Sequence, residues 1–474
     1  MFIGRERELR ALEHEYSKPG SNTYAVYGRR RVGKTALLLE FCKRKPSIFL
    51  TGYQNYEPDM FRYMEEAISD YLGEKVTINE SGDLFRILSS IKTEEKIVVV
   101  IDEFPDMARL CPATPSQLRT FIDTRMGDLN MMMIVCGSSI SAMLEELNDG
   151  GGPLFGRFPI QVKILPLKYT EARRLNPGLS EEDRMKIFCI SGGLPPYHIG
   201  FGSDTPEAGI KRMFLGVSPW GLIDTNGLTA MELNPHRKYS EILSNIHSGS
   251  TASAIAAESK MGEAECIRLL NNLIFLGMVR KDVCFGMKKR TLYRISDGMV
   301  DFCYEIVRRY SCRMDFFDED RAYENIREEV ASFYGHRFEE ICKEYVADNY
   351  ECRTIEDWWG TAPVFRNGIM VRDDDGKVVT EDGDIDIVTR AGSGDVNYLL
   401  LGECKFTDKP VGRKELETLI MRSESLNERS IEKRYVLFSR SGFSDSLRDY
   451  LDEHPKPVVD LVDMDIMEEW AESR

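Results

Sequence analysis

The sequence predicts an α/β protein of several domains, the first of which is built on a parallel sheet. Over about the first 165 residues, short apolar runs alternate with amphipathic stretches, a pattern typical of strands and helices in a parallel α/β sheet. The chain has 474 residues, too many for one ordinary core. The pattern changes along the chain and divides it into regions 1–165, 166–235, 236–310 and 315–474.

The strands of the first region are predicted from its apolar runs, Thr23–Tyr27, Ser47–Thr51, Ile97–Ile101, Met131–Cys136 and Ile160–Ile164. Between them, Lys34–Phe41 and Asp59–Tyr71 have the spacing of amphipathic helices. The apolar runs are far shorter than the ~20 residues that cross a bilayer. The chain also opens without a basic-then-apolar signal segment. We therefore expect a cytoplasmic protein with no membrane partner.

Composition and charge narrow the class of protein. Hydrophobic residues make up 42% and charged residues 30% of the chain, which excludes a disordered or fibrous protein. The 11 cysteines form no CxxC pair, which argues against a disulfide framework and a zinc cluster. The formal charge of −16 opposes nucleic-acid binding by the surface as a whole, so such binding must use a local basic patch.

A phosphate-binding loop follows the first predicted strand. It fits the GxxxxGKS/T pattern at every fixed position and is made of Gly28, Arg29, Arg30, Arg31, Val32, Gly33, Lys34 and Thr35. Glycines let backbone N–H groups curl round phosphates, and the helix that follows adds its positive end. Lys34 is expected to bridge the β- and γ-phosphates of ATP, and Thr35 to ligate Mg²⁺.

Two carboxylates at the end of the strand Ile97–Ile101 complete this site. Asp102 is expected to hold the Mg²⁺ shell, and Glu103 to polarise the attacking water as general base. The loop and the carboxylates together predict an ATPase that binds ATP and Mg²⁺. The alternative, acidic residues that merely cap a strand, does not explain why both motifs occur.

Two further residues are candidates for the ATP site, each with an ordinary alternative. Ser138 follows the strand Met131–Cys136, where a polar side chain is expected to sense the γ-phosphate, unless the segment is a plain Ser-rich turn. Arg157 is a candidate arginine finger. It would act in its own chain or on a neighbouring subunit, unless it is an ordinary surface arginine.

Residues 166–235 are predicted to form a helical lid, and residues 236–310 a winged helix. In the winged helix, helices are expected at Lys238–Ile246, Thr251–Lys260 and Glu263–Leu276, and a hairpin at Met278–Phe285 and Arg290–Ile295. The third helix has few basic residues near its start, whereas Lys288, Lys289 and Arg290 lie at the hairpin bend. Either the bend contacts DNA, or the region only packs against the nucleotide domain.

The last region, 315–474, is predicted to be a second α/β domain. Helices are expected at Ala322–Tyr345 and Arg413–Leu426, and strands at Ile385–Thr389, Tyr398–Cys404 and Arg434–Ser439. The acidic segment Arg372–Gly383 contains glycine and is expected to be an exposed loop.

Carboxylates and a lysine lie on two of these strands. Asp386 is on one strand and Glu403 and Lys405 are on the next, where the period of two puts the latter pair on one face. Asp386 and Glu403 can bind Mg²⁺ and activate water, while Lys405 can orient that water or stabilise charge on a phosphate. Glu339 on the preceding helix adds a further carboxylate ligand. The alternative is an exposed, charged strand edge.

The N-terminal motifs resemble those of the archaeal ATPase family, a STAND-like branch of the AAA+ P-loop ATPases. The resemblance extends to about residue 310 and rests on Phe2–Leu9, the phosphate loop with its two carboxylates, Gly137–Ser139 and Pro153–Arg157. It implies that the opening segment packs beside the adenine. It also implies that Gly193-Leu194-Pro195 senses the nucleotide.

The C-terminal motifs resemble the PD-(D/E)xK nuclease-like domain that is often fused to such ATPases and has a restriction-endonuclease-like fold. They are Tyr334–Glu339, Trp358-Trp359, Asp384–Val388, Glu403–Lys405 and Phe438–Phe443. The chain departs from the family pattern at Asp384, where the family usually has Glu, and in the long acidic segment before it. Neither departure removes a proposed metal ligand, although the negative segment would hinder the approach of DNA.

These expectations combine into an ATP-driven molecular switch that controls a DNA-directed, metal-dependent nuclease-like domain. ATP, Mg²⁺ and DNA are the expected ligands, and assembly into a homo-oligomer is left open. One rival is a signalling ATPase whose C-terminal domain is an inactive scaffold. The other is a winged-helix DNA-binding regulator that responds to ATP.

Overall fold

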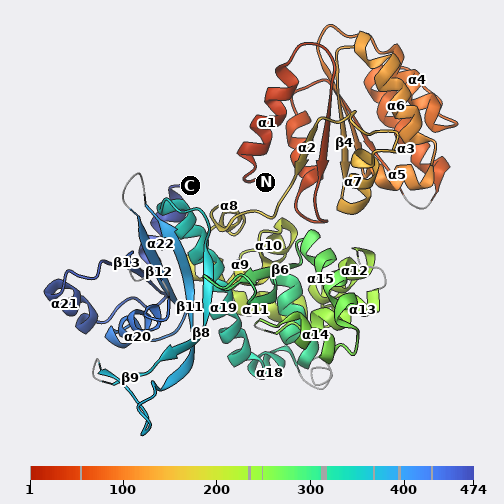
Figure 1. Cartoon of the computed structure of the whole chain (residues 1–474). Helices are drawn as coiled ribbons and strands as arrows, with labels where there is room; N and C mark the ends of the chain where they lie inside the picture. The colour runs from red at the N-terminus through yellow and green to blue at the C-terminus, as the bar shows by residue number, and fades with distance from the viewer. Residues whose placement is uncertain are drawn as a thin grey trace. The chain divides into compact units, whose positions relative to one another are not determined.

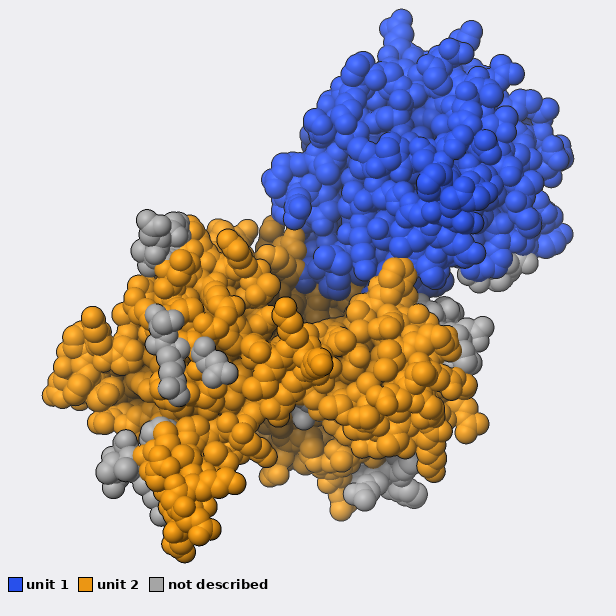
Figure 2. Space-filling view, viewed as in Figure 1, with its two compact units in different colours: residues 1–167 blue, residues 168–474 orange. Residues whose placement is uncertain are grey.

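A computed structural model of the chain describes residues 2–53, 56–232, 236–247, 249–310, 318–366, 369–392, 397–426, 428 and 431–474. The chain forms two compact units, Met1–Leu167 and Lys168–Arg474, which are blue and orange in Figure 2. The first unit ends close to the predicted boundary at residue 165. The three later regions belong to one unit, so their division at residues 235 and 310 stays a prediction.

The first unit is built on a five-stranded parallel sheet with the strand order β2-β3-β4-β1-β5. Its strands are β1 Asn22–Tyr27, β2 Ser47–Thr51, β3 Ile97–Asp102, β4 Met131–Gly137 and β5 Ile160–Lys163. The predicted strands are confirmed, and each predicted end lies within one residue of the observed one. Every residue of β3 and β4 is buried, which explains their uninterrupted apolar sequences.

Helices cover both faces of this sheet (Figure 1). On one side lie α1 Glu6–Ser17 and α2 Lys34–Cys42, and on the other α3 Glu57–Leu72, α4 Ser81–Ser90, α5 Phe104–Leu110, α6 Thr114–Thr124 and α7 Ile140–Asn148. A short 3-10 helix spans Met126–Asp128. The helices α2 and α3 confirm the two predicted helices of this region. Residues of α3 to α7 share one apolar core with the strands that they face.

The second unit opens with a helical segment, as expected for residues 166–235. Its helices are α8 Tyr169–Ala172, α9 Glu181–Ser191, α10 Pro195–Phe201, α11 Pro206–Ile210 and α12 Trp220–Glu232. A 3-10 helix at Arg173–Leu175 and a π-helical turn at Lys211–Leu215 complete the segment.

Three helices and an antiparallel hairpin follow, in the predicted order. They are α13 His236–Ser244, α14 Ala252–Glu258, α15 Glu263–Phe275, β6 Val279–Val283 and β7 Thr291–Ile295. These elements share an apolar core with the start of the next segment, α16 Gly298–Phe302 and the π-helical turn Cys303–Val307. The two residues that follow β6, Cys284 and Phe285, lie in a different core, that of the C-terminal sheet.

The C-terminal part is built on a mixed five-stranded sheet with the order β14-β13-β12-β11-β8. Its strands are β8 Glu356–Pro363, β11 Thr380–Ala391, β12 Tyr398–Lys405, β13 Glu432–Ser439 and β14 Val459–Val462. The pairs β8–β11 and β11–β12 are antiparallel, whereas β12–β13 and β13–β14 are parallel. The short strands β9 Phe365–Arg366 and β10 Ile369–Met370 pair separately.

Helices pack on both faces of this second sheet as well. They include α19 Arg327–Asn349, α20 Arg413–Ser423, α21 Asp445–Glu453 and α22 Met464–Glu472. The short helix α18 Glu319–Glu324 contacts the π-helical turn Lys211–Leu215 instead. Leu416 and Leu419 of α20 share a core with Leu399 and Leu401 of β12. The helix α19 contacts other side chains of the sheet, and Phe338 lies against Phe406 with ring centroids 5.0 Å apart.

Two local predictions for this region were wrong. The predicted helix Ala322–Tyr345 is interrupted at Ile326, which has φ −118° and ψ 2°, and α19 begins at the next residue. The predicted loop Arg372–Gly383 does not extend to its expected end, because Thr380–Gly383 is the first part of β11. Those residues pair with β8 from Pro363 to Gly360, so tertiary pairing overrides their polar sequence.

Candidate functional site

The phosphate loop of the first unit connects β1 to α2. Gly33 has φ +92°, a left-handed conformation that suits glycine, and α2 begins at the next residue. No side chain caps the N-terminus of α2, so its first N–H groups suit an anionic ligand. Lys34 is buried and its Nζ donates to the carbonyl oxygens of Gly28 and Arg29 at 2.9 and 3.0 Å. The lysine therefore bends back over the loop, where phosphates would bind.

The candidate magnesium ligands of this unit lie in contact. The Thr35 hydroxyl donates to Oδ2 of Asp102 at 2.6 Å, and Oδ1 of Asp102 accepts the N–H of Glu103 at 3.0 Å. Asp102 ends β3 and is buried. A hydroxyl and a carboxylate are oxygen ligands of the kind that Mg²⁺ prefers, so the donor set at this site fits the ion.

Glu103 is held by the residue at the end of the neighbouring strand. Its Oε2 accepts both the N–H of Ser138 at 3.0 Å and the Ser138 hydroxyl at 2.9 Å. Glu103 itself has φ +49°, an uncommon conformation for a residue other than glycine. The structure thus brings Ser138 to the candidate base, a contact that the sequence did not predict.

Arg5 is a further residue of this site that sequence reasoning missed. Its NH2 group donates to the carbonyl oxygens of Val32 at 2.9 Å and Leu165 at 2.6 Å, and its side chain is buried. The arginine thereby ties the phosphate loop to the segment after β5. No sequence pattern signals this contact, because 160 residues separate Arg5 from Leu165.

Arg157 lies away from the phosphate loop. Its carbonyl oxygen accepts the hydroxyl of Thr23 near the start of β1, whereas the phosphate loop follows the end of that strand. Its guanidinium contacts Asp123, with Nε–Oδ1 3.3 Å and NH2–Oδ2 3.1 Å. The structure thus places Arg157 away from the ATP site of its own chain. The two interpretations that remain are action on a neighbouring subunit and an ordinary surface arginine.

The segment Gly193–Pro195, to which the family resemblance gives a nucleotide-sensing role, is supported by a buried histidine. His198 Nε2 lies 2.6 Å from the carbonyl oxygen of Gly192, and Nδ1 lies 2.8 Å from Oδ1 of Asn176. Burial lowers the pKa of His198 to about 4. The histidine is therefore neutral at physiological pH, and the sensing role stays a prediction.

In the second unit, the predicted C-terminal residues lie together. Oδ2 of Asp386 accepts the N–H of Cys404 at 2.8 Å, which ties β11 to β12 beside Glu403. Lys405 forms an ion pair with Glu403, so both side chains lie on one face of β12 as the period of two predicted. Glu339 of α19 is close enough to raise the pKa of Asp386.

Burial and neighbouring carboxylates raise the pKa values of Asp386 and Glu339. Burial is the largest cause for Asp386, followed by the charges of Glu339 and Glu403, and together they raise its pKa well above the usual range. Burial also raises the pKa of Glu339 to about 7, although the charge of Lys343 opposes this. Carboxyl groups that share a site favour an added cation. The donor chemistry therefore fits a divalent metal ion.

The donor atoms of these side chains suit a metal ion, but the positions of the side chains fit one less well. Within the part of the chain that the structure describes, no group of three or more His, Cys, Asp or Glu side chains is placed to hold a metal ion. Glu403 is engaged by Lys405. Asp384, the position at which the family pattern differs, is paired with Arg422 at 3.0 Å. A metal ion at this site would have Lys405 beside one of its carboxylate ligands, Glu403.

A cavity of about 190 Å³ adjoins these carboxylates. Glu339, Asp384 and Asp386 line it together with Arg280 and Arg294 of the hairpin β6–β7. The sequence predicted that Glu339 joins Asp386, but not that Arg280 and Arg294 line the same cavity, because these residues come from four elements that are far apart in the chain.

The fold of the first unit, the position of Lys34 over the phosphate loop and the contacts among Thr35, Asp102 and Glu103 define a P-loop ATPase domain. Residues 2–199 match the family model of an ATPase domain predominantly from Archaea, and this part of the chain is an ATPase domain of that family. Residues 303–419 match a model of archaeal and bacterial proteins of unknown function. That stretch contains all four candidate residues of the C-terminal site.

Individual relatives agree with this assignment. An uncharacterized protein of Methanocaldococcus jannaschii is 25% identical over an alignment of 376 positions, which covers 76% of this chain and 82% of the relative. An uncharacterized ATP-binding protein of Pyrococcus horikoshii is 24% identical over an alignment of 237 positions, which covers 42% of this chain and 73% of the relative.

A solved structure shares the fold. The Walker-type ATPase of Pyrococcus abyssi is 20% identical, covers 64% of this chain and 96% of its own, and has a TM-score of 0.51. At this identity the likeness shows the fold alone. Among the described helices, none combines the length and apolarity needed to cross a bilayer.

Proposed function

We propose that the chain is an ATP-hydrolysing molecular switch whose nucleotide state controls a DNA-directed, metal-dependent nuclease-like C-terminal domain. The observation that carries the second half is the gathering of Asp386, Glu403 and Lys405 on two neighbouring strands, with Glu339 beside them. In this proposal the elements of 236–310 form a winged helix. The C-terminal domain has the restriction-endonuclease-like fold.

In the ATPase domain, each residue has a role that its position supports. The N–H groups of the loop and Lys34 hold the phosphates, and Thr35 and Asp102 hold Mg²⁺. When bound, Mg²⁺ neutralises charge that develops on the phosphates. Glu103 accepts the proton of the attacking water, and Ser138 fixes the orientation of that carboxylate.

In the C-terminal domain, Asp386, Glu403 and Glu339 would hold the divalent ion, which supplies Lewis acidity when bound. Lys405 lies next to Glu403 and is partly exposed. Its ammonium group would therefore stabilise negative charge on the phosphodiester. The raised pKa values of Asp386 and Glu339 mean that the ion must displace protons as it binds.

Phosphate release and DNA nicking, measured on one preparation with and without Mg²⁺ and DNA, test both halves. Lys34→Ala should abolish ATP binding, and Glu103→Gln should keep binding but slow turnover at least ~100-fold. Asp386→Ala, Glu403→Ala and Lys405→Ala should each abolish nicking and leave phosphate release intact. The assay belongs at low ionic strength, because a chain with charge −16 binds DNA weakly and with a steep salt dependence.

The second candidate function is a signalling ATPase whose C-terminal domain is a scaffold for protein contacts. The ion pair between Lys405 and Glu403 favours it, as does the lack of a preformed three-ligand site among the described side chains. Absence of nicking of duplex, branched and single-stranded DNA in every nucleotide state would select this candidate. Nicking that persists in all three C-terminal variants would instead identify a contaminant.

The third candidate, a winged-helix regulator, has less support from the contacts. Near the start of α15, Glu265 pairs with Lys238, which leaves a poor surface for DNA phosphates. The hairpin that would act as the wing is engaged by the C-terminal sheet through Cys284 and Phe285. DNA binding that requires Arg268 of α15 and not the C-terminal site would favour this candidate.

A further inference from the structure

The hairpin β6–β7 is anchored on the edge strand of the C-terminal sheet. The N–H of Phe285 donates to the carbonyl oxygen of Asp357 in β8 at 2.9 Å, and Sγ of Cys284 donates to that of Trp359 at 3.3 Å. Both hairpin side chains are buried with Trp358 in one core. The hairpin therefore belongs structurally to the C-terminal sheet, although it follows the three-helix segment in sequence.

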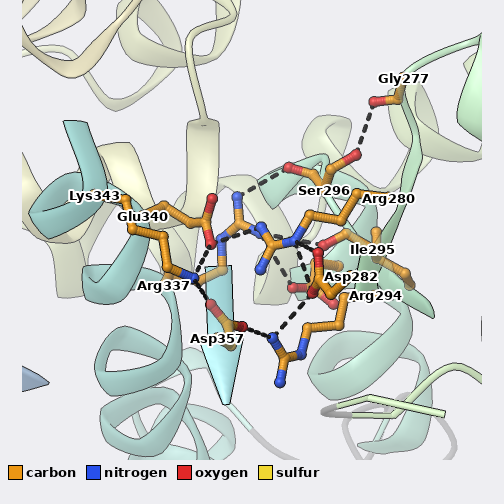
Figure 3. A network of polar contacts seen from close by, with 11 residues as sticks. Gly277, Arg280, Asp282, Arg294, Ile295, Ser296, Arg337, Glu340, Lys343 and Asp357 are labelled. Carbon is orange, nitrogen blue, oxygen red and sulfur yellow. Dashed lines mark hydrogen bonds and ion pairs between the residues drawn. The ribbon is translucent and has the colours of Figure 1, made fainter. Parts of the chain in front are cut away.

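Ion pairs hold the base of the hairpin to the same domain (Figure 3). Arg280 of β6 contacts Glu340 of α19 at 2.6 Å, and Arg294 of β7 contacts Asp357 of β8 at 2.5 Å. Asp282 lies between the two arginines and accepts from each at 3.0 Å. The two strands thus present arginines whose positions are fixed by carboxylates on three elements.

Further contacts surround these ion pairs. Lys343 of α19 contacts Asp357 at 2.6 Å. Arg337, one helical turn from Glu340, donates to the carbonyl oxygens of Ile295 and Ser296 at 3.2 and 3.0 Å. Buried and partly buried charges paired in this way have well-defined positions. The network is therefore suited to holding a side chain in place beside a ligand.

The same network forms one wall of the cavity at the candidate nuclease site. Arg280, Arg294 and Arg337 line it together with their acidic partners Glu340 and Asp357. Glu339 of α19 and Asp386 of β11 line it as well. At about 190 Å³, the cavity has room for a small ligand such as a phosphate group.

We infer that the hairpin is the phosphate-binding wall of the candidate nuclease site, with Arg294 contacting the phosphodiester backbone of DNA. This inference rests on the proposed nuclease function and adds a substrate contact to it. About 24% of the Arg294 side chain is exposed, so a ligand in the cavity can reach it. Its charge also acts on Glu339, which places it beside the candidate metal ligands. Recognition through the backbone is independent of sequence.

The test measures DNA binding by fluorescence anisotropy in the full chain, with Glu403→Gln as the background so that DNA is not consumed. Arg294→Gln should weaken binding of unrelated oligonucleotide sequences to the same extent and reduce the slope of log affinity against log salt by about 1. Arg294→Lys keeps the charge and should retain the slope. Arg327→Gln, at the exposed start of α19, is the matched control and should bind as the background does.

A second variant distinguishes DNA contact by Arg294 from a network that only supports the fold. Asp282→Asn breaks the same ion pairs from the acidic side while it removes a negative charge beside the cavity. If Arg294 contacts DNA, this variant should bind DNA as tightly as the background or more tightly. Equal weakening by Arg294→Gln and Asp282→Asn would show that the network only supports the fold and would overturn the inference.

Two other results separate the inference from the function on which it rests. Nicking by the parent chain together with unchanged binding by Arg294→Gln would leave the nuclease function standing and remove the hairpin from it. No DNA binding by the parent chain at low salt would remove both. Tryptophan fluorescence of each variant checks its folding, since the four tryptophans of the chain all lie in the second unit.

Discussion

Ser138 donates two hydrogen bonds to one carboxylate oxygen of Glu103, from its N–H at 3.0 Å and from its hydroxyl at 2.9 Å. The two residues lie at the ends of the neighbouring strands β4 and β3, which pair in parallel. The serine therefore connects the candidate base to the end of a buried strand. A γ-phosphate that displaced the hydroxyl would change the orientation of Glu103, so the two roles considered for Ser138 are linked.

We predict that Ser138→Ala slows ATP turnover by about 10-fold and leaves ATP affinity nearly unchanged. The variant loses one of two hydrogen bonds to a carboxylate, which is worth about 1.5 kcal/mol, and the backbone N–H bond remains. Single-turnover hydrolysis together with calorimetric titration separates the two effects. Ser139→Ala is the matched control, because that hydroxyl caps α7 and does not contact Glu103.

A second prediction concerns Arg5, which holds the carbonyl oxygens of Val32 and Leu165. Arg5→Ala leaves one buried and one partly buried acceptor without a charged donor, so it should destabilise the first unit by about 2 kcal/mol and weaken ATP binding. Thermal unfolding with and without ATP measures both effects. Arg7→Ala, an exposed arginine of α1, should match the parent. An Arg5→Ala chain with unchanged melting would show that the phosphate loop holds its shape without this contact.

The strands of the ATPase sheet were predictable because their environment is uniform. Helices cover both faces of β3 and β4, so all of their residues are buried and the sequence shows unbroken apolar runs. The strand β8 was not predicted. The sequence Glu356–Pro363 mixes charged, aromatic and small residues. One edge of this strand pairs with β11 and the other contacts the hairpin, and neither contact can be read from the local sequence.

The residues of the two candidate sites also differ in whether the sequence could predict them. Lys34, Thr35, Asp102 and Glu103 were predictable because local sequence fixes the loop, the helix start and the strand end on which they lie. The network around Arg294 was not, since Arg294 and Asp357 are 63 residues apart. No periodicity signals a contact of that kind, and it depends on how the hairpin packs against β8.

The third prediction tests Arg157 as a group that acts on a neighbouring subunit. If it does, mixing equal amounts of Arg157→Ala and Lys34→Ala chains should restore hydrolysis at about a quarter of the interfaces, since a mixed interface of one orientation retains both groups. Light scattering must first establish that the chain is an oligomer. A mixture as inactive as either variant alone would count against the transfer of this side chain between subunits.

The ion pair of Arg157 provides the control for that experiment. Both partners are partly exposed, at 29% for Arg157 and 38% for Asp123, so the pair contributes little to stability. Asp123→Asn breaks it and keeps the arginine. Loss of hydrolysis in Asp123→Asn would indicate that the pair matters for folding or position. Full activity there, with loss in Arg157→Ala, would indicate that the guanidinium itself is required.

The last prediction concerns Glu344 of α19, near the point where the second unit begins. Its Oε2 accepts the N–H of Tyr169 at 2.9 Å. Burial is the main cause that raises the pKa of Glu344 to about 7, and the charges of Asp348 and Glu340 add to it. The Tyr169 N–H and the Lys168 ammonium group oppose the rise. Glu344 is therefore protonated in the folded unit over a pH range in which an unfolded chain has released the proton.

The sign of the pH effect follows from that difference. Between the unfolded pKa near 4.5 and the folded pKa near 7, the folded chain binds more protons, so the free energy of unfolding falls as pH rises. Glu344→Gln has no proton to lose and still accepts the Tyr169 N–H through its amide oxygen. The variant should match the parent near pH 4.5 and exceed it at pH 8, by on the order of 1 kcal/mol after allowance for solvent screening.

Denaturant unfolding followed by tryptophan fluorescence measures this difference in the second unit alone, because Trp220, Trp358, Trp359 and Trp470 all lie there. Glu328→Gln, an exposed glutamate at the start of the same helix, is the matched control and should follow the parent at every pH. Parallel stability curves for Glu344→Gln and the parent from pH 5 to pH 8 would show that Glu344 is ionised throughout. The charge on this carboxylate would then be stabilised by Lys168 and the Tyr169 N–H despite its burial.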